Sequence, residues 1–297
     1  MARPRLAPLI GLLAAWSIAG AADEAARTPK FAWPGDLACR VEQRSSATGG
    51  PESVIRFTLQ ASEAPDDGRF IEATLAELQP MDTAEAAFQL ATRLPAFHVG
   101  LQGSLLGLRD AAKAKEKIRE ALVAALPAPP AANELEQMVN QLSTPALLEN
   151  QVGNFWNAAV EQWVGRELSA KPITGDAETT IPGSTVPLKV TATMERAREL
   201  PCTRGGKSRQ CAEFVSTEVP EAANLREVMR AILGADGAAE IDRIRSMSLH
   251  TRTVTLAEPD TLIPHRVSVT RTIRIERAGE AAPGETVERQ SWTFDCD

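Results

Sequence analysis

Tyrosine is absent from this 297-residue chain, aromatic residues make up only 4% of it, and there are only three histidines. The scarcity of aromatics argues against a carbohydrate-binding surface, because such surfaces stack sugars on Trp and Tyr faces. The four cysteines include no pair at the spacing of about 2–4 residues that zinc sites use. Beyond the N-terminal region no apolar run is long enough to cross a bilayer, so we expect no integral membrane span in the mature protein.

Catalytic motifs are also lacking. No His-Glu-x-x-His, Gly-x-Ser-x-Gly or Ser-x-x-Lys pattern occurs, and no glycine-rich phosphate loop follows a strand. Carboxylates are common in a chain that is 24% charged, so spacing alone nominates no pair for acid–base catalysis. The sequence predicts neither a cofactor nor a metal, and it leaves open whether the protein is an enzyme.

The N-terminus has the pattern of a secretory signal peptide. Arg3 and Arg5 precede an uncharged, mostly apolar run over residues 6–19, and Ala19-Gly20-Ala21 is a small-x-small cleavage site. A membrane anchor is the alternative, but the run is shorter than the roughly 20 residues that a span needs. We therefore predict a signal peptide over residues 1–21 and an exported protein, periplasmic or extracellular in a bacterium.

The charge balance excludes two kinds of partner. The formal net charge is −7, and it falls further when the two arginines of the signal peptide are removed. An acidic exported protein has no electrostatic attraction for nucleic acid or for an anionic membrane surface. An apolar small molecule, a lipid or another envelope protein remains as the expected partner.

The four cysteines predict two disulfides, because an even count in an exported chain is typical of disulfide pairing. Three pairings are possible. Cys202 and Cys211 flank a polar run with Gly205-Gly206 at its centre, which favours a local bridge across a hairpin. Cys39 would then pair with Cys296 and tie the first strand of the mature domain to the last.

The order of periodic segments predicts one α+β domain over residues 37–297, after a flexible N-terminal segment at 22–36. Alternating residues predict strands near 37–42, 55–61 and 70–78, and again near 186–194, 212–217, 246–256, 265–277 and 286–296. Helical spacing predicts an inserted helical block at about 82–165, with helices at 84–94, 108–126, 133–142 and from Thr144-Pro145 onward, and a further helix near 221–233. Asp82, with Glu85 three residues on, has the capping-box spacing for the first of these helices. We expect a curved antiparallel sheet, built from the N- and C-terminal strand groups, with the helical block packed on one face.

Two features suggest a binding site. The segment at 97–108 is apolar and contains three glycines, which is typical either of a mobile lid over a greasy cavity or of a tightly packed connection between helices. If it is a lid, the ligand-binding residues are Phe97, Leu101, Leu105, Phe155, Trp156 and Trp163. Arg271 lies in the apolar phase of its strand, either to meet an anionic ligand or because its stem covers apolar surface while its head reaches water.

Residues 145–217 combine a Trp-containing helix, an IPGSTVPLKVTATM strand and a PCTRGGKSRQC hairpin. This pattern resembles uncharacterised bacterial exported proteins, and the layout loosely resembles the periplasmic lipoprotein carriers, in which a curved sheet cups a helical lid. The resemblance implies a non-catalytic protein that binds a hydrophobic ligand or a partner segment between sheet and helices. A structural or assembly factor of the envelope with a filled core, or an enzyme with an unrecognised site, are the alternatives.

Overall fold

A computed structural model describes residues 28–128, 130–179, 181, 184–278 and 283–297, so the predicted signal peptide lies outside the described residues. Within these ranges, eleven strands form one antiparallel sheet in the order β5-β4-β3-β2-β1-β11-β10-β9-β8-β7-β6. Six helical segments accompany the sheet in this part of the chain, which makes the fold the mixed α+β class that the sequence predicts.

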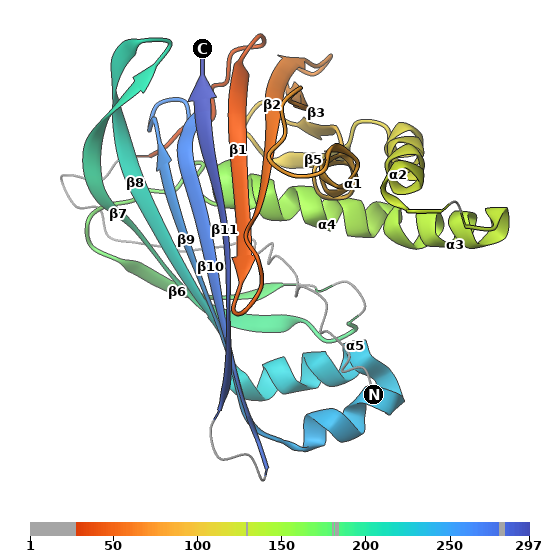
Figure 1. Ribbon diagram of the computed structural model, residues 1–297. Helices are drawn as coiled ribbons and strands as arrows, with labels where there is room; N and C mark the ends of the chain where they lie inside the picture. The colour runs from red at the N-terminus through yellow and green to blue at the C-terminus, as the bar shows by residue number, and fades with distance from the viewer. Residues whose placement is uncertain (1–27, 129, 180, 182–183, 279–282) are drawn as a thin grey trace.

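The strands are β1 (Ala38–Ala47), β2 (Ser53–Glu63), β3 (Arg69–Leu75), β4 (Phe97–Val99), β5 (Leu105–Leu108), β6 (Ile173–Thr179), β7 (Leu188–Arg204), β8 (Lys207–Pro220), β9 (Ile244–Ala257), β10 (Pro264–Arg277) and β11 (Gly284–Cys296). The helices are α1 (Thr83–Arg93), α2 (Ala111–Ala125), α3 (Ala132–Leu142), α4 (Pro145–Trp156), the π-helix η1 (Asn157–Glu161) and α5 (Ala222–Asp242). Figure 1 shows α5 beside the lower part of the long strands, away from α1–α4.

The two strand groups meet where β1 pairs with β11, and Figure 1 shows these strands side by side. Cys39 lies opposite Cys296 in that register, and a disulfide joins them. The second disulfide, Cys202–Cys211, crosses the β7–β8 hairpin. Both predicted disulfides are therefore confirmed, and the pair at the chain ends fixes the register at the centre of the sheet.

The β7–β8 hairpin turns at two glycines. Gly205 and Gly206 have φ values of 52° and 73°, the left-handed conformation that both central residues of a type I′ turn need. A side chain is disfavoured in this region of φ, whereas glycine enters it freely. The Arg-Gly-Gly-Lys sequence therefore fixes the turn, and the disulfide closes the strands below it.

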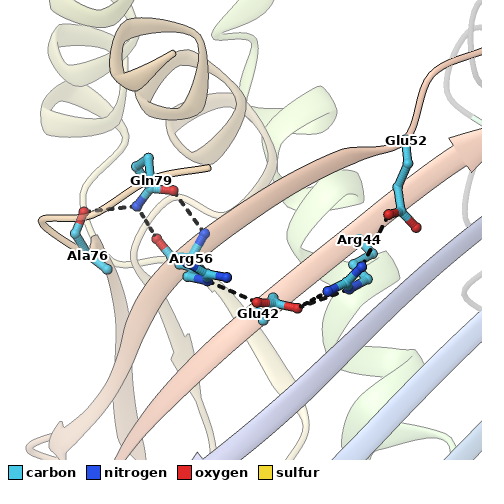
Figure 2. A network of polar contacts seen from close by, with 6 residues as sticks. All are labelled: Glu42, Arg44, Glu52, Arg56, Ala76 and Gln79. Carbon is cyan, nitrogen blue, oxygen red and sulfur yellow. Dashed lines mark hydrogen bonds and ion pairs between the residues drawn. The ribbon is translucent and has the colours of Figure 1, made fainter. Parts of the chain in front are cut away.

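Alternation along the strands gives the sheet two different faces. On the outer face Glu42 accepts hydrogen bonds from Arg44 at 2.7 Å and from Arg56 at 2.9 Å, and Arg44 also reaches Glu52 at 3.2 Å. Figure 2 shows this network running across β1 and β2, with Gln79 bonded to the Arg56 backbone. Hydrogen bonds from Arg56 and Arg44 lower the pKa of the Glu42 carboxyl, so this exposed network is charged at neutral pH.

The inner face carries two separate apolar clusters. The larger one combines residues of α1, α4 and η1 with inward residues of β1–β4 and β7–β11, such as Phe57, Val267 and Trp292. The smaller one joins α5 to the other ends of β6, β7, β9 and β10, through residues such as Val228, Val190 and Leu249. Two groups of helices thus cover different parts of one sheet face.

Local sequence explains where most helices begin. Asp82 caps α1 by accepting from the backbone N–H groups of Ala84 and Glu85, as the capping pattern predicts. We expected the next helix to begin at Leu108, but α2 begins at Ala111 because Asp110 accepts from the Lys113 N–H and the residues before it form β5.

The helix α4 continues into the π-helix η1, where the ordinary i to i−4 hydrogen bonding is interrupted. The Ala158 carbonyl there accepts from the Thr255 hydroxyl at 2.7 Å and from the Trp163 indole at 3.1 Å. A π-turn in a helix leaves carbonyls that need partners from outside the helix. The bond from Thr255 holds η1 against β9, and the bond from Trp163 is local.

The glycine-rich segment forms the short hairpin β4–β5 at one edge of the sheet. Gly103 has a φ of +80°, and a Cβ there would lie 2.8 Å from Phe31. The Gly103 carbonyl accepts a hydrogen bond from the Trp156 indole at 2.6 Å. At this glycine the segment is tightly packed against its neighbours, which is the arrangement of a buried connection.

Part of the predicted flexible segment at 22–36 is attached to the domain. Backbone N–H groups of Lys30 and Ala32 donate to the carbonyls of Pro259 and Thr261 at 3.1 and 3.2 Å. The indole of Trp33, buried in the larger cluster, donates to the Leu262 carbonyl at 3.1 Å. The described residues before β1 therefore cover the loop between β9 and β10 and are not loose.

Candidate functional site

A row of polar residues crosses the inner face between the two apolar clusters. Glu218 on β8 pairs in register with Thr251 on β9, Thr251 with Arg271 on β10, and Arg271 with Glu288 on β11. Neighbouring strands lie about 4.8 Å apart, and residues opposite one another share a face. These four residues therefore lie side by side on the inner face, one on each of four neighbouring strands, and we call them the polar row.

Burial perturbs the ionisable members of the row. Glu218 is only 9% exposed, and loss of water raises the pKa of its carboxyl from 4.5 to about 7, although the charge of Arg271 opposes the rise. Burial likewise lowers the pKa of Arg271, with Glu288 and then Glu218 opposing that change. Arg271 forms no hydrogen bond or ion pair with the described part of the chain, and the buried Thr251 hydroxyl also has no partner there.

A pocket of about 590 Å³ opens beside this row. Its walls come from α1, the end of α3, α4, β1 with the start of β2, and β10 with β11. Apolar side chains form much of the lining: Phe88, Leu94, Leu142, Leu147, Phe155, Val269 and Trp292. We call it the α1–α4 pocket, and its volume lies within the range of roughly 300–1,000 Å³ typical of small-molecule sites.

Three hydrogen-bond donors in the pocket lack acceptors. Arg93, in the last turn of α1, has no partner among the described residues, and only loss of water acts on its guanidinium, which lowers the pKa. Arg271 contributes the second guanidinium. The third donor is the amide nitrogen Nε2 of Gln43, a side chain only 5% exposed.

The orientation of the Gln43 amide follows from its neighbour. The Trp292 indole donates to Gln43 Oε1 at 3.2 Å. Because an indole N–H can only donate, the oxygen must face Trp292 and the nitrogen must be the free end. On α4, the buried Oδ1 of Asn154 has no donor among the described residues. Buried polar atoms without partners are rare, and these lie in one pocket.

A second pocket of about 570 Å³ lies between β3, α1 and α2. Its lining is largely alanine and leucine, and three of its charged residues interact with one another. Glu72 accepts from Lys117 at 2.9 Å and lies 3.7 Å from Arg109, and Arg109 stacks over Phe70. Three of the charges in this pocket are thus already used within the protein.

The structure divides the seven residues that the sequence nominated for ligand binding. Phe155 and Arg271 line the α1–α4 pocket. Phe97 and Trp156 are buried in a cluster of aromatic rings with Phe31 and Trp33.

The remaining three nominated residues lie outside the α1–α4 pocket. Trp163 stacks on Phe214, with the ring centroids 5.5 Å apart. Leu105 is partly buried beside the larger cluster. Leu101 is 64% exposed. The aromatic rings around Trp156 fill the space between them, so the space for a ligand lies beside Phe155 instead.

Two pocket residues were not anticipated from the sequence. Gln43 follows Cys39 and Val41 on the inward phase of β1, and this polar residue in an apolar phase is the same signal that identified Arg271. Arg93 gives no comparable signal, because a basic residue in the last turn of a helix is ordinary.

The stapled hairpin brings Cys202, Cys211 and His265 within 4.8 Å of one another. Both sulfurs are bonded in the disulfide, and only a thiolate binds a metal strongly. His265 lies instead 3.6 Å from Glu258, and burial lowers its pKa. This cluster is the stapled base of a hairpin.

None of the described helices has the length and hydropathy needed to cross a bilayer. Comparisons with protein-family models, with curated proteins and with solved structures gave no match to this chain. The resemblance of residues 145–217 to exported proteins and lipoprotein carriers therefore stays a hypothesis, and the function has to be argued from the pocket itself.

Proposed function

We propose that this is an exported, non-catalytic protein that binds an apolar ligand, a lipid chain or a hydrophobic segment of an envelope protein, between its sheet and its helices. The observation that carries the proposal is the α1–α4 pocket, about 590 Å³ in volume, with large apolar side chains in its walls. Two disulfides support export, because such bonds form and persist in oxidising compartments.

The site differs in position from the one that the glycine-rich segment suggests. Its apolar walls are contributed by α1, α3, α4, β10 and β11. A bound apolar ligand would therefore lie between elements that are far apart in the sequence. Burying apolar surface contributes roughly 25 cal/mol per Å², and a mostly preformed pocket reduces the ordering cost of binding. These features favour binding of a flexible apolar chain.

Displacement of a fluorescent apolar probe, N-phenyl-1-naphthylamine, tests the proposal. We expect saturable binding to the oxidised protein, weakened at least fivefold by Leu147→Trp, which fills the pocket. The matched control is Val123→Trp on α2, where the side chain is 41% exposed and lies outside both pocket linings. Native mass spectrometry of protein purified from its own host should show a co-purified mass.

A structural role in the cell envelope is the second candidate. The filled cluster around Trp156, which occupies the place where the sequence suggested a cavity, favours it. Absence of probe binding, together with absence of a co-purified mass, would support this candidate and contradict a binding function.

A further inference from the structure

We propose that the ligand of the α1–α4 pocket is an amphiphile with an anionic head group, a carboxylate or a phosphate, bound by Arg93, Arg271 and Gln43. This inference rests on the proposed function and names the chemical class of its ligand. The apolar walls would hold the acyl chain, and the three donors would hold the head group.

The first argument is the charge of the pocket. Its ionisable lining residues are three arginines, Arg93, Arg271 and Arg289, and one carboxylate, Glu288. The chain as a whole carries a formal net charge of −7, so this pocket is positive within an acidic protein. Electrostatic complementarity therefore selects an anion here and disfavours a cationic ligand.

The second argument is the absence of partners for the two inner arginines. Buried charges in proteins are normally paired. Arg271 has Glu288 opposite it in the strand register, yet no ion pair within 4.0 Å joins them. Arg93 has no carboxylate partner at all among the described residues. An anion between them would supply the missing acceptors for both guanidiniums.

Burial supports the same conclusion. Loss of water lowers the pKa of Arg93 and of Arg271, but a guanidinium stays protonated in proteins. The protein therefore keeps two poorly solvated cations beside one pocket. A bound anion would relieve that unfavourable solvation, so it should stabilise the folded protein as well as bind.

Gln43 supplies an independent observation. The Gln43 side chain is only 5% exposed, and its oxygen accepts the hydrogen bond from the Trp292 indole. Its Nε2 therefore remains a buried donor without an acceptor among the described residues. A carboxylate or phosphate oxygen can accept from several donors at once. A long-chain alcohol offers only one uncharged hydroxyl oxygen as acceptor and would leave the arginines without a counter-charge.

The apolar walls argue against a free anion. Inorganic phosphate would bury none of the apolar surface of the pocket, so side chains such as Phe88, Leu147 and Phe155 would stay in contact with water. An acyl chain on the anion covers that surface. The pocket therefore combines the two halves of an amphiphile.

Isothermal titration calorimetry with four probes tests the inference: dodecanoate, dodecyl phosphate, dodecanol and inorganic phosphate, each below the concentration at which it aggregates. We expect both anionic amphiphiles to bind at least tenfold more tightly than dodecanol, and inorganic phosphate to bind far more weakly than dodecyl phosphate. If dodecanol binds as tightly as dodecanoate, the head-group inference fails and the apolar function stands. If no acyl probe binds, the proposed function fails as well.

Variants separate recognition from folding. Arg93→Gln should weaken both anionic amphiphiles about tenfold or more, the loss typical of a charged hydrogen bond, while dodecanol is unaffected. It should also raise the melting temperature of the ligand-free protein, because it removes an unpaired and only partly solvated charge. Arg252→Gln, an exposed arginine on the outer face of β9, is the charge-matched control and should change neither affinity.

Arg93→Lys, which keeps the positive charge, should retain part of the affinity for the anions. Equal weakening of anionic and neutral probes by Arg93→Gln would contradict the inference, since that result indicates lost packing and not lost head-group contacts. Tight binding of inorganic phosphate alone would show a site for a free anion, and this would also overturn the amphiphile.

Discussion

Replacing Glu218 with glutamine should stabilise the protein at pH 8 and leave its stability near pH 4.5 almost unchanged. The carboxyl is buried, and its pKa is raised from the ordinary 4.5 to about 7 in the folded chain. Between these two pH values the folded state keeps a proton that the unfolded state has released. The free energy of unfolding therefore falls as pH rises through this interval.

The size of the effect follows from the shift. A displacement from 4.5 to about 7 corresponds to about 3 kcal/mol, since each pKa unit is worth about 1.4 kcal/mol. The attraction of Arg271 is already included, because it opposes the rise. Glutamine has almost the same shape and cannot ionise, so the variant should gain up to about 3 kcal/mol over the wild type at pH 8.

Urea unfolding of oxidised wild-type and Glu218→Gln protein, from pH 4.5 to 8 at fixed ionic strength, measures this difference. Other titrating groups are common to both proteins and cancel in it. The control is Glu213→Gln on the same strand, which is equally buried but accepts two hydrogen bonds of 3.1 Å from Arg198. That change should destabilise at pH 8, because it breaks a charged pair. A pH-independent difference for Glu218→Gln would refute the reasoning.

Three further predictions concern the packing. Removing the Cys39–Cys296 bridge by a double change to serine should lower the free energy of unfolding by up to about 5 kcal/mol, because it closes a loop of 257 residues; urea unfolding with and without reductant checks this. Gly103→Ala should cost about 1–3 kcal/mol, since the new Cβ would meet Phe31 at 2.8 Å and φ is +80°, and a thermal melt that matches wild type would contradict the packing. Trp156→Phe should cost about 2–4 kcal/mol through lost volume and the lost hydrogen bond to Gly103, measured by urea unfolding.

Much of this fold follows from short-range sequence patterns. Alternation predicts most of the long strands, and Asp82 and Pro145 predict the starts of α1 and α4. The pairing of β1 with β11 could be anticipated because the cysteines link the two ends. The strands β4 and β5 were not predicted, since glycines in an apolar run read equally well as a loop, and only their pairing with β3 makes them strands.

The candidate site was less predictable than the fold. Arg271 stands out because it breaks an apolar phase on one strand, and that signal needs no tertiary information. The cavity beside Phe155 and the filled cluster around Trp156 are both lined by large apolar residues. The sequence cannot show which group of apolar residues packs without a gap and which leaves a cavity. Arg93 comes from a helix far from β10 in the chain, and only the packing of α1 over the sheet brings it to the same pocket.

The pairing of the first strand with the last has a consequence for biogenesis. β1 is synthesised long before β11, so during that interval its edge toward β11 and the Cys39 thiol both lack their native partners. An open strand edge recruits other chains, and a free thiol forms mixed disulfides in an oxidising compartment. Truncation before β11 should therefore yield disulfide-linked aggregates. Addition of the final strand is thus the step that protects the new polypeptide from intermolecular strand pairing and disulfide exchange.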